Sequence, residues 1–188
     1  MTRVVVAMTG ASGAAIGLRV LEFLAALPGM ETHLVLSHAA ERTLAHEVGT
    51  AAAERARVLA DVVYAVDDIG ASIASGSFAS AGMLVVPCSM HSLAAIAAGI
   101  ADNLIVRAAD VHLKERRRLV LMARETPLHL GHLRSMVAVT EMGAIVMPPV
   151  PAFYNLPQSV DDIVDQLAAR AIDLLGLPGE RLAREWRG

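Results

Sequence analysis

A glycine-rich segment near the start of the chain has the residue types and spacing that bind an anion. It follows an apolar run and places glycines at positions 10, 13 and 17, just before a helical pattern. Glycines let a backbone turn tightly, and the first amides of the following helix are free to donate to a phosphate. The spacing differs from G-x-G-x-x-G, and the second apolar run ends in Ser37 rather than in an acidic residue. These features favour a mononucleotide over a dinucleotide, although a turn needed only for close helix–strand packing would use the same glycines.

A second candidate site lies in the segment 87–92, at the end of another apolar run. Ser89 and Ser92 supply hydroxyl donors beside a helix start, where a parallel sheet places its ligands. Ordinary helix capping by Ser89 would explain the same residue. His91 is a candidate base, although a lone histidine is more often structural. We interpret Cys88 as a buried small apolar residue, because no residue that would activate its thiol is identifiable.

Cationic residues follow in a helical pattern. Arg107 and Lys114 are seven residues apart, which puts them on one helix face and two turns apart. Two cations aligned in this way can grip a phosphate, the arginine through its fork and the lysine as a point charge. We interpret the three arginines at 116–118 as a solvated helix C-terminus, where cations complement the helix dipole.

Two further segments carry residues suited to proton transfer or to lining a pocket. Arg124 and Glu125 end an apolar run, so the arginine could bind a phosphate while the glutamate moves a proton beside it. A surface ion pair between them is the alternative. Tyr154 ends the proline-rich stretch 148–154, which suits either a pocket wall or an oligomer contact.

Short apolar runs alternate with longer helical patterns, which is typical of a parallel sheet covered by helices on both faces. The predicted strands cover residues 3–8, 32–36, 62–66, 83–87, 119–122 and 144–147. The predicted helices cover residues 14–27, 39–48, 92–98, 105–116, 130–140 and 160–175, the last with Ser159 as its N-cap. The conspicuous loops cover residues 70–80 and 148–157. We therefore expect one doubly wound α/β domain over residues 1–188, with about six parallel strands and a C-terminal helix and tail from about residue 159.

Composition excludes several classes of protein. The chain has 188 residues, of which 55% are hydrophobic and 19% charged, so it is not intrinsically disordered. Its net charge of −3 gives no general attraction to nucleic acid, its single cysteine cannot form an internal disulfide, and its seven histidines show no metal-ligand spacing. No apolar run approaches the roughly 18 residues of a membrane span, and glycines interrupt the one stretch that resembles a signal peptide. We expect a cytoplasmic protein, and its surplus of small apolar residues suggests a homo-oligomer.

Seven blocks of sequence resemble the UbiX-type flavin prenyltransferases, which include the small partner subunits of phenolic-acid and hydroxybenzoate decarboxylase systems. They cover almost the whole chain in order. The blocks are GASGA at 10–14, ASGSF at 74–78, PCSM at 87–90, ADNL at 101–104, RAADVHLKERRRLVL at 107–121, RETPL at 124–128 and PPVPAFYNLPQSVDDIV at 148–164. The resemblance implies a Rossmann-like flavoprotein fold, assembled as a dodecamer whose active site is shared between subunits.

The resemblance also implies a metal-independent transferase. Such an enzyme joins a dimethylallyl group from dimethylallyl phosphate to N5 and C6 of reduced FMN. The prenylated FMN then passes to a UbiD-type decarboxylase.

Site residues follow from the same resemblance, position by position. The positions that match FMN contacts are Gly10, Ala11, Ser12, Ser37, Ser89, Met90, His91, Ser92 and Arg124. The positions that match the prenyl-phosphate group are Arg107, Lys114, Tyr154, Arg170 and the shared Arg124. Ser12, Glu47 and Glu125 match positions implicated in proton movement. No metal ligand is implied.

Two departures from the family pattern bear on these assignments. Many relatives carry Lys-Thr where this chain has His91-Ser92, which affects the expected FMN contacts. The segment 124–136 is closer to relatives from aromatic-acid decarboxylase systems than to the ubiquinone-pathway type.

Two alternative functions share this fold. One is a non-catalytic FMN carrier subunit of an aromatic-acid decarboxylase, and the other is a flavin-dependent decarboxylase of cysteine-containing substrates. Retention of Glu47, Glu125, Lys114 and Arg170 argues against a carrier, because storage of FMN needs no second phosphate site. The thiol-substrate decarboxylases resemble a P-A-S-A-N pattern, whereas this chain has PCSM at 87–90.

Overall fold

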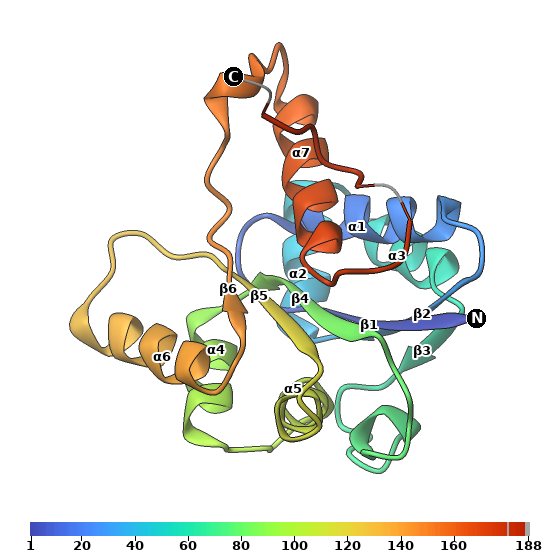
Figure 1. Ribbon diagram of the computed structural model, residues 1–188, viewed down its shortest axis with the longest axis vertical. Coiled ribbons are helices and arrows are strands. Elements are labelled where there is room, and N and C mark those ends of the chain that lie inside the picture. Colours follow the sequence, from blue (N-terminus) through green and yellow to red (C-terminus); the bar gives the residue numbers. More distant parts are fainter. Residues whose placement is uncertain (180, 187–188) are drawn as a thin grey trace.

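One six-stranded sheet forms the centre of the chain in a computed structural model, which describes residues 1–179 and 181–186 (Figure 1). All neighbouring strands pair in parallel, in the order β3-β2-β1-β4-β5-β6. The predicted α/β architecture is therefore confirmed. The strand order reverses between β1 and β4, and a sheet of this kind places its ligand at the carboxyl ends of those two strands. The strands are β1 (Thr2–Met8), β2 (Met30–Leu36), β3 (Val62–Tyr64), β4 (Gly82–Cys88), β5 (Arg118–Ala123) and β6 (Ile145–Val146).

The central strands are apolar along their whole length because helices cover both faces of the sheet. All seven residues of β4 are buried, as are the last five of β1. Val4 and Val6 of β1 enter one core, whereas Val5 and Ala7 enter the other. Alternate side chains of a strand point to opposite faces, so a strand buried on both faces has a continuous apolar run rather than an alternating pattern.

The described helices form two layers, one on each face of the sheet (Figure 1). One layer contains α1 (Ala14–Ala26), α2 (His38–Glu47), α3 (Ala52–Leu59) and α7 (Val160–Asp173). The other contains α4 (Met90–Ala98), α5 (Leu104–Lys114) and α6 (Leu130–Glu141). Among the residues that the structure describes, none of these helices has the length and apolarity that a membrane crossing requires.

The structure differs from the predicted elements in a few places. Helix α3 was not predicted, because the only side chains that it buries are two alanines, which give a weak amphipathic signal. The third and sixth strands are shorter than predicted. The two predicted loops contain single 3₁₀ turns, η1 (Ser72–Ala74) and η2 (Phe153–Asn155).

The C-terminal part of the chain leaves the sheet after β6 and returns as α7. Figure 1 shows the segment before α7 extending away from the sheet and ending beside the last described residues. Ser159 caps α7 as predicted, because its hydroxyl accepts a hydrogen bond from the Asp162 amide at 3.1 Å. The Asp162 carboxylate accepts in return from the Ser159 amide, which completes a capping box.

Candidate active site

The glycine-rich loop after β1 enters α1 with two of its predicted anion-binding amides already engaged. Gly13 has a φ of +107°, in the left-handed region that glycine tolerates. Oε2 of Glu47, at the end of α2, accepts hydrogen bonds from the amides of Gly13 at 3.0 Å and Ala14 at 2.8 Å. The expectation that these two amides are free for a phosphate was therefore wrong, because Glu47 occupies the positive end of the α1 dipole. Close packing explains Gly17, where a Cβ would collide with the carbonyl oxygen of Val86.

Glu47 is held in its charged form by its neighbours. Partial burial alone would raise its pKa, but the Ser12 hydroxyl, the two amides of the loop and the positive charge of Arg124 together lower it below its ordinary value. Ser12, Glu47 and Arg124 come from the loop after β1, from α2 and from the end of β5. We call these three residues the carboxyl-edge cluster. A hydroxyl that donates to an ionised carboxylate is an arrangement that can hold and move a proton.

Thr9 ties the glycine-rich loop to the segment after β4. Its side chain is 2% exposed, and its Oγ1 donates to the carbonyl of Pro87 at 2.9 Å and accepts from the amide of Ser89 at 2.7 Å. Gly10 and Ala11, two of the positions predicted to contact FMN, come directly after Thr9 in the loop. Sequence analysis missed Thr9, although a polar residue at the end of an apolar strand was the available signal.

Ser37 and Ser89, two of the serines predicted to contact the ligand, are helix caps in the structure. The Ser37 hydroxyl accepts from the amide three residues later at 3.0 Å and begins α2. The Ser89 hydroxyl accepts from the Ser92 amide at 3.3 Å, begins α4 and lies 3.2 Å from the Ser92 hydroxyl. Capping uses only a lone pair, so the Ser37 hydroxyl proton remains available to a ligand. Met90 and His91 follow in the first turn of α4, the former partly buried and the latter exposed.

Arg124 and Glu125 lie at the end of β5, beside the segment 87–92. The amide of Arg124 donates to the carbonyl of Cys88 at 3.1 Å. Glu125 is exposed and accepts from the amide of Thr126 at 3.0 Å, and the described residues contain no ion pair between Arg124 and Glu125. Cys88 is fully buried, which confirms its interpretation as a buried apolar residue. Burial raises the pKa of its thiol to about 12.

Arg107 and Lys114 lie along α5, in the helix layer opposite α1. Arg107 pairs with Asp110, and Lys114 pairs with Glu115. The end of α5 leads into the start of β5, so Lys114 lies at the amino edge of the sheet, away from the carboxyl-edge cluster. Within one chain the structure does not bring Lys114 to that cluster.

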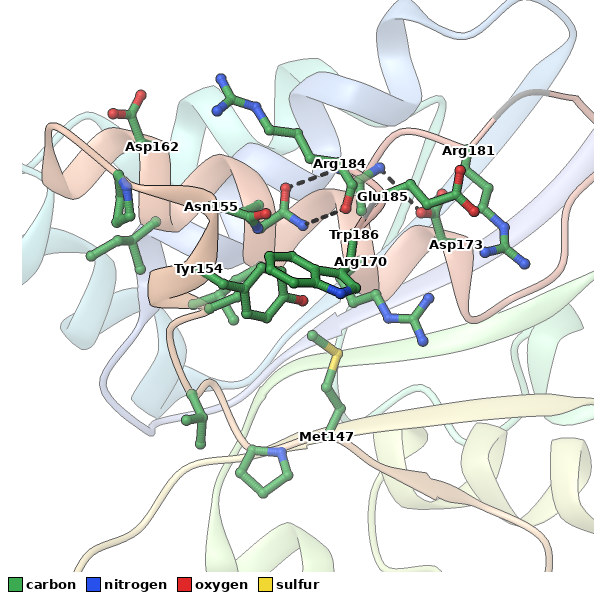
Figure 2. Close-up of a pocket in the computed structure, with 18 residues that line it drawn as sticks. Met147, Tyr154, Asn155, Asp162, Arg170, Asp173, Arg181, Arg184, Glu185 and Trp186 are labelled. Atoms are coloured by element: carbon green, nitrogen blue, oxygen red, sulfur yellow. Dashed lines mark hydrogen bonds between the residues drawn. The ribbon is translucent and has the colours of Figure 1, made fainter. Parts of the chain in front are cut away.

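Tyr154 and Arg170 line a cavity of about 450 Å³ between the segment before α7, α7 itself and the C-terminal tail (Figure 2). The ring of Trp186 packs edge-on against Tyr154, with the ring centroids 5.2 Å apart. Arg181 and Arg184 also line the cavity, whereas no residue of the carboxyl-edge cluster does. The cavity is therefore a second, arginine-rich and aromatic site in the same chain.

The C-terminal tail that closes this cavity is held through its backbone. The Asp173 carboxylate accepts from the amides of Leu182 at 2.9 Å and Ala183 at 3.1 Å. The Gln166 side chain accepts from the amide of Arg184 at 3.1 Å and donates to its carbonyl at 3.4 Å. Sequence analysis predicted a C-terminal tail but not its contacts with α7, because backbone contacts of this kind leave no pattern of side chains. The only signal was that the chain has a single tryptophan, Trp186.

Comparison with known proteins agrees with the fold and these motifs. The flavoprotein family model matches residues 1–172. A probable UbiX-like flavin prenyltransferase from Streptomyces sp. (strain D7) is 55% identical over 99% of this chain and 92% of its own length.

Two solved structures are similar over the whole chain. One is AnUbiX (PadA1) in complex with FMN and dimethylallyl pyrophosphate, with 50% identity, a TM-score of 0.92 and coverage of 100% of this chain and 98% of that one. The other is a dodecameric FMN-dependent UbiX-like decarboxylase from Escherichia coli O157:H7, with 48% identity, a TM-score of 0.94 and full coverage of both chains. The chain therefore belongs to the UbiX family of flavin prenyltransferases.

Proposed function

We propose that this protein transfers a dimethylallyl group from dimethylallyl phosphate to N5 and C6 of reduced FMN, which yields prenylated FMN. The observation that carries the proposal is the carboxyl-edge cluster, in which the backbone amides of Gly13 and Ala14 hold the Glu47 carboxylate, and Ser12 and Arg124 favour its charged form. Half of the residues are identical to those of a relative solved with FMN and dimethylallyl pyrophosphate, which supports the same substrates here.

The carboxyl edge of the sheet carries donors that suit FMN. The hydroxyl of Ser37 and the guanidinium of Arg124 are the kinds of group that bind a phosphate monoester. Both lie at the edge where a parallel sheet binds its ligand. Bound FMN supplies the nucleophilic atoms of the reaction. We assign to Ser12 and Glu47 the role of taking up and passing on the proton released when the new bonds form.

The phosphate of the prenyl donor requires cations, because it is the leaving group and negative charge grows on it as its bond to the allylic carbon breaks. We assign this role to Arg107, Lys114, Tyr154 and Arg170, together with Arg124, and we assign proton movement near the phosphate to Glu125. In one chain these residues lie on α5, in the arginine-rich cavity and at the carboxyl edge. We therefore propose that neighbouring copies complete one another's sites in a homo-oligomer.

A dodecamer is the assembly that we propose, because a relative with 48% identity is described as dodecameric. Exposed large apolar side chains on α6 and around η2 are consistent with contacts between copies, since soluble monomers rarely expose such groups together. These side chains are Leu130, Leu133, Val137, Phe153, Leu156 and Val160.

The product, prenylated FMN, would serve as the cofactor of a second protein. We propose that prenylated FMN is passed to a UbiD-type decarboxylase, and that the protein works in the cytoplasm. The apolar run near the N-terminus forms the central strand β1, which supports reading it as part of the fold rather than as a cleaved signal.

Anaerobic incubation with reduced FMN and dimethylallyl phosphate, followed by mass spectrometry of the released flavin, tests the proposal. A flavin heavier by one five-carbon prenyl unit is the expected result. Stoichiometrically bound but unchanged FMN, with both the monophosphate and the diphosphate donor, would instead favour the carrier function.

A further inference from the structure

The loop after η1 is fastened to the end of α5 by two side chains. The guanidinium of Arg117 donates to the carbonyl oxygens of Gly76 and Phe78, both at 2.6 Å. The ring of His112, which is 1% exposed, hydrogen-bonds to the Ser80 hydroxyl at 2.8 Å and to the carbonyl of Ala108 at 2.7 Å. Residues 76–80 are therefore held at three points by α5 and the turn that follows it.

The way that α5 ends explains why Arg117 faces this loop. Arg116 has a φ of +57°, and the amide of Arg117 donates to the carbonyl of His112 at 2.8 Å, while the amide of Arg116 donates to that of Leu113 at 3.1 Å. This is the hydrogen-bond pattern of a Schellman motif, which reverses the chain direction. Arg116 and Arg118 are exposed, whereas Arg117 is partly buried. The interpretation of all three arginines as solvated was therefore wrong for Arg117.

The charge state of His112 agrees with this fastening role. Burial lowers the pKa of His112 to about 4, so the ring is neutral at pH 7. A carbonyl oxygen can only accept, so Nδ1 carries the proton and donates to Ala108, and Nε2 accepts from Ser80.

Gly76 forms the surface beneath the ammonium group of Lys114. A Cβ at Gly76 would lie 2.6 Å from Nζ of Lys114 and would collide with the Glu115 carboxylate that pairs with it. A side chain at this position would force the flexible ends of Lys114 and Glu115 to move from where they now lie. The Gly76 carbonyl is one of the two that Arg117 fixes.

We infer that Arg117 is a positioning residue for Lys114. Its two hydrogen bonds hold the backbone at 76–78, so that the Lys114 ammonium is presented in one place to the phosphate of the prenyl donor. This inference rests on the proposed function, which assigns Lys114 to that phosphate. Arg117 itself need not touch the substrate, because it acts through the loop.

Steady-state kinetics of Arg117→Gln test the inference, with Arg118→Gln as the matched control. Glutamine cannot reproduce the two-pronged contact of a guanidinium. We expect the KM for dimethylallyl phosphate to rise about tenfold or more, which corresponds to about 1.4 kcal/mol, while the Kd for FMN stays within twofold. Arg118→Gln should leave both constants unchanged.

A double-mutant cycle separates positioning from a general loss of structure. If Arg117 acts through Lys114, then Arg117→Gln should add little to the effect of Lys114→Ala on the KM. Additive effects, an unchanged KM, or an equal loss of FMN affinity would overturn the inference. Gly76→Ala, which keeps Arg117 but crowds Lys114, should raise the same KM.

The proposed function has its own, separate outcome in these experiments. If the unmodified protein forms prenylated FMN and Lys114→Ala raises the KM for the donor, the function stands whatever Arg117 does. If no prenylated flavin forms, the function falls, and the inference about Arg117 falls with it.

Discussion

Replacing Glu47 with glutamine separates the charge of this side chain from its shape. The carboxylate accepts from two backbone amides at the start of α1, and the nearby Ser12 hydroxyl also favours its charged form. A glutamine side chain in its place would be nearly isosteric, but it would carry no charge and could offer only one acceptor oxygen. The substitution therefore tests both the stability that Glu47 gives to α1 and its proposed part in proton movement.

The expected loss of stability can be worked out from these contacts. A hydrogen bond to a charged group contributes about 1 kcal/mol more than a neutral one, and a carboxylate at a helix N-terminus contributes about 0.3–1 kcal/mol. In a buried site, the two hydrogen bonds from backbone amides and the interaction with the helix dipole would together contribute about 2–3 kcal/mol to the free energy of unfolding. The Glu47 side chain is exposed to solvent, which screens these contributions, so we expect about 1 kcal/mol. That corresponds to a melting temperature lower by roughly 2–4 °C for a chain of this length.

The dependence on pH identifies the charge as the cause. The pKa of Glu47 in the folded protein is below its ordinary value of 4.5, so its contribution is fully present above pH 4.5 and is lost as the pH falls through the folded pKa. Melting curves followed by circular dichroism should therefore show the full difference between the two proteins at about pH 7. In acid, the difference in melting temperature between the two proteins should disappear.

Activity provides the second measurement. Removing a general acid or base typically lowers kcat by about 10²–10⁴, and we expect a fall in that range with FMN still bound. Glu54→Gln is the matched control, because Glu54 is also exposed and near a helix start but accepts no amide hydrogen bond among the described contacts. A melting difference that stays constant from neutral pH into acid, or an unchanged kcat, would refute this account of Glu47.

Three other predictions follow from features of the same structure. Thr9→Val should destabilise the protein by about 1–3 kcal/mol and weaken FMN binding, because it leaves the Ser89 amide unpaired and removes one of the two hydrogen bonds that the Pro87 carbonyl accepts. Chemical denaturation and FMN titration measure the two effects, with Thr9→Ser as the control that keeps the hydroxyl. Arg116→Gly should raise the melting temperature by roughly 2–4 °C, because glycine adopts a φ of +57° without the cost of about 1 kcal/mol that other residues incur, and an unchanged or lower value would contradict this. Cys88 should resist alkylation by iodoacetamide at about pH 8 in the folded protein, because its thiol is buried and its pKa is about 12. It should react once the protein is unfolded, and mass spectrometry of the folded and unfolded samples measures the difference in alkylation.

Much of the fold could be predicted from the sequence, because the strands are buried on both faces and appear as separate apolar runs. Helix α3 could not, because it buries only small side chains. Ser37 and Ser89 were correctly located at strand ends, but a serine that caps a helix and a serine that binds a phosphate occupy the same kind of position. The sequence alone therefore cannot decide between these roles.

The candidate site was only partly predictable for a different reason. Ser12, Glu47 and Arg124 are distant in sequence, and only the resemblance to a family grouped them. Spacing along one helix placed Arg107 and Lys114 on α5, but it did not indicate at which edge of the sheet Lys114 would lie. The contacts of the Arg117 guanidinium could not be predicted from the sequence, because its partners are backbone carbonyls, which every residue possesses.

The attachment of the C-terminal tail has a consequence for how this protein can change. Gln166 and Asp173 are seven residues apart on α7, about 10 Å along its axis, and they bind the tail through main-chain groups. Any residue except proline supplies the amides at 182–184, so substitutions there should be tolerated. An insertion or deletion in the connection after α7 would instead slide the tail along the helix and carry Trp186 away from Tyr154. The length of this connection, more than its composition, keeps the aromatic pair together.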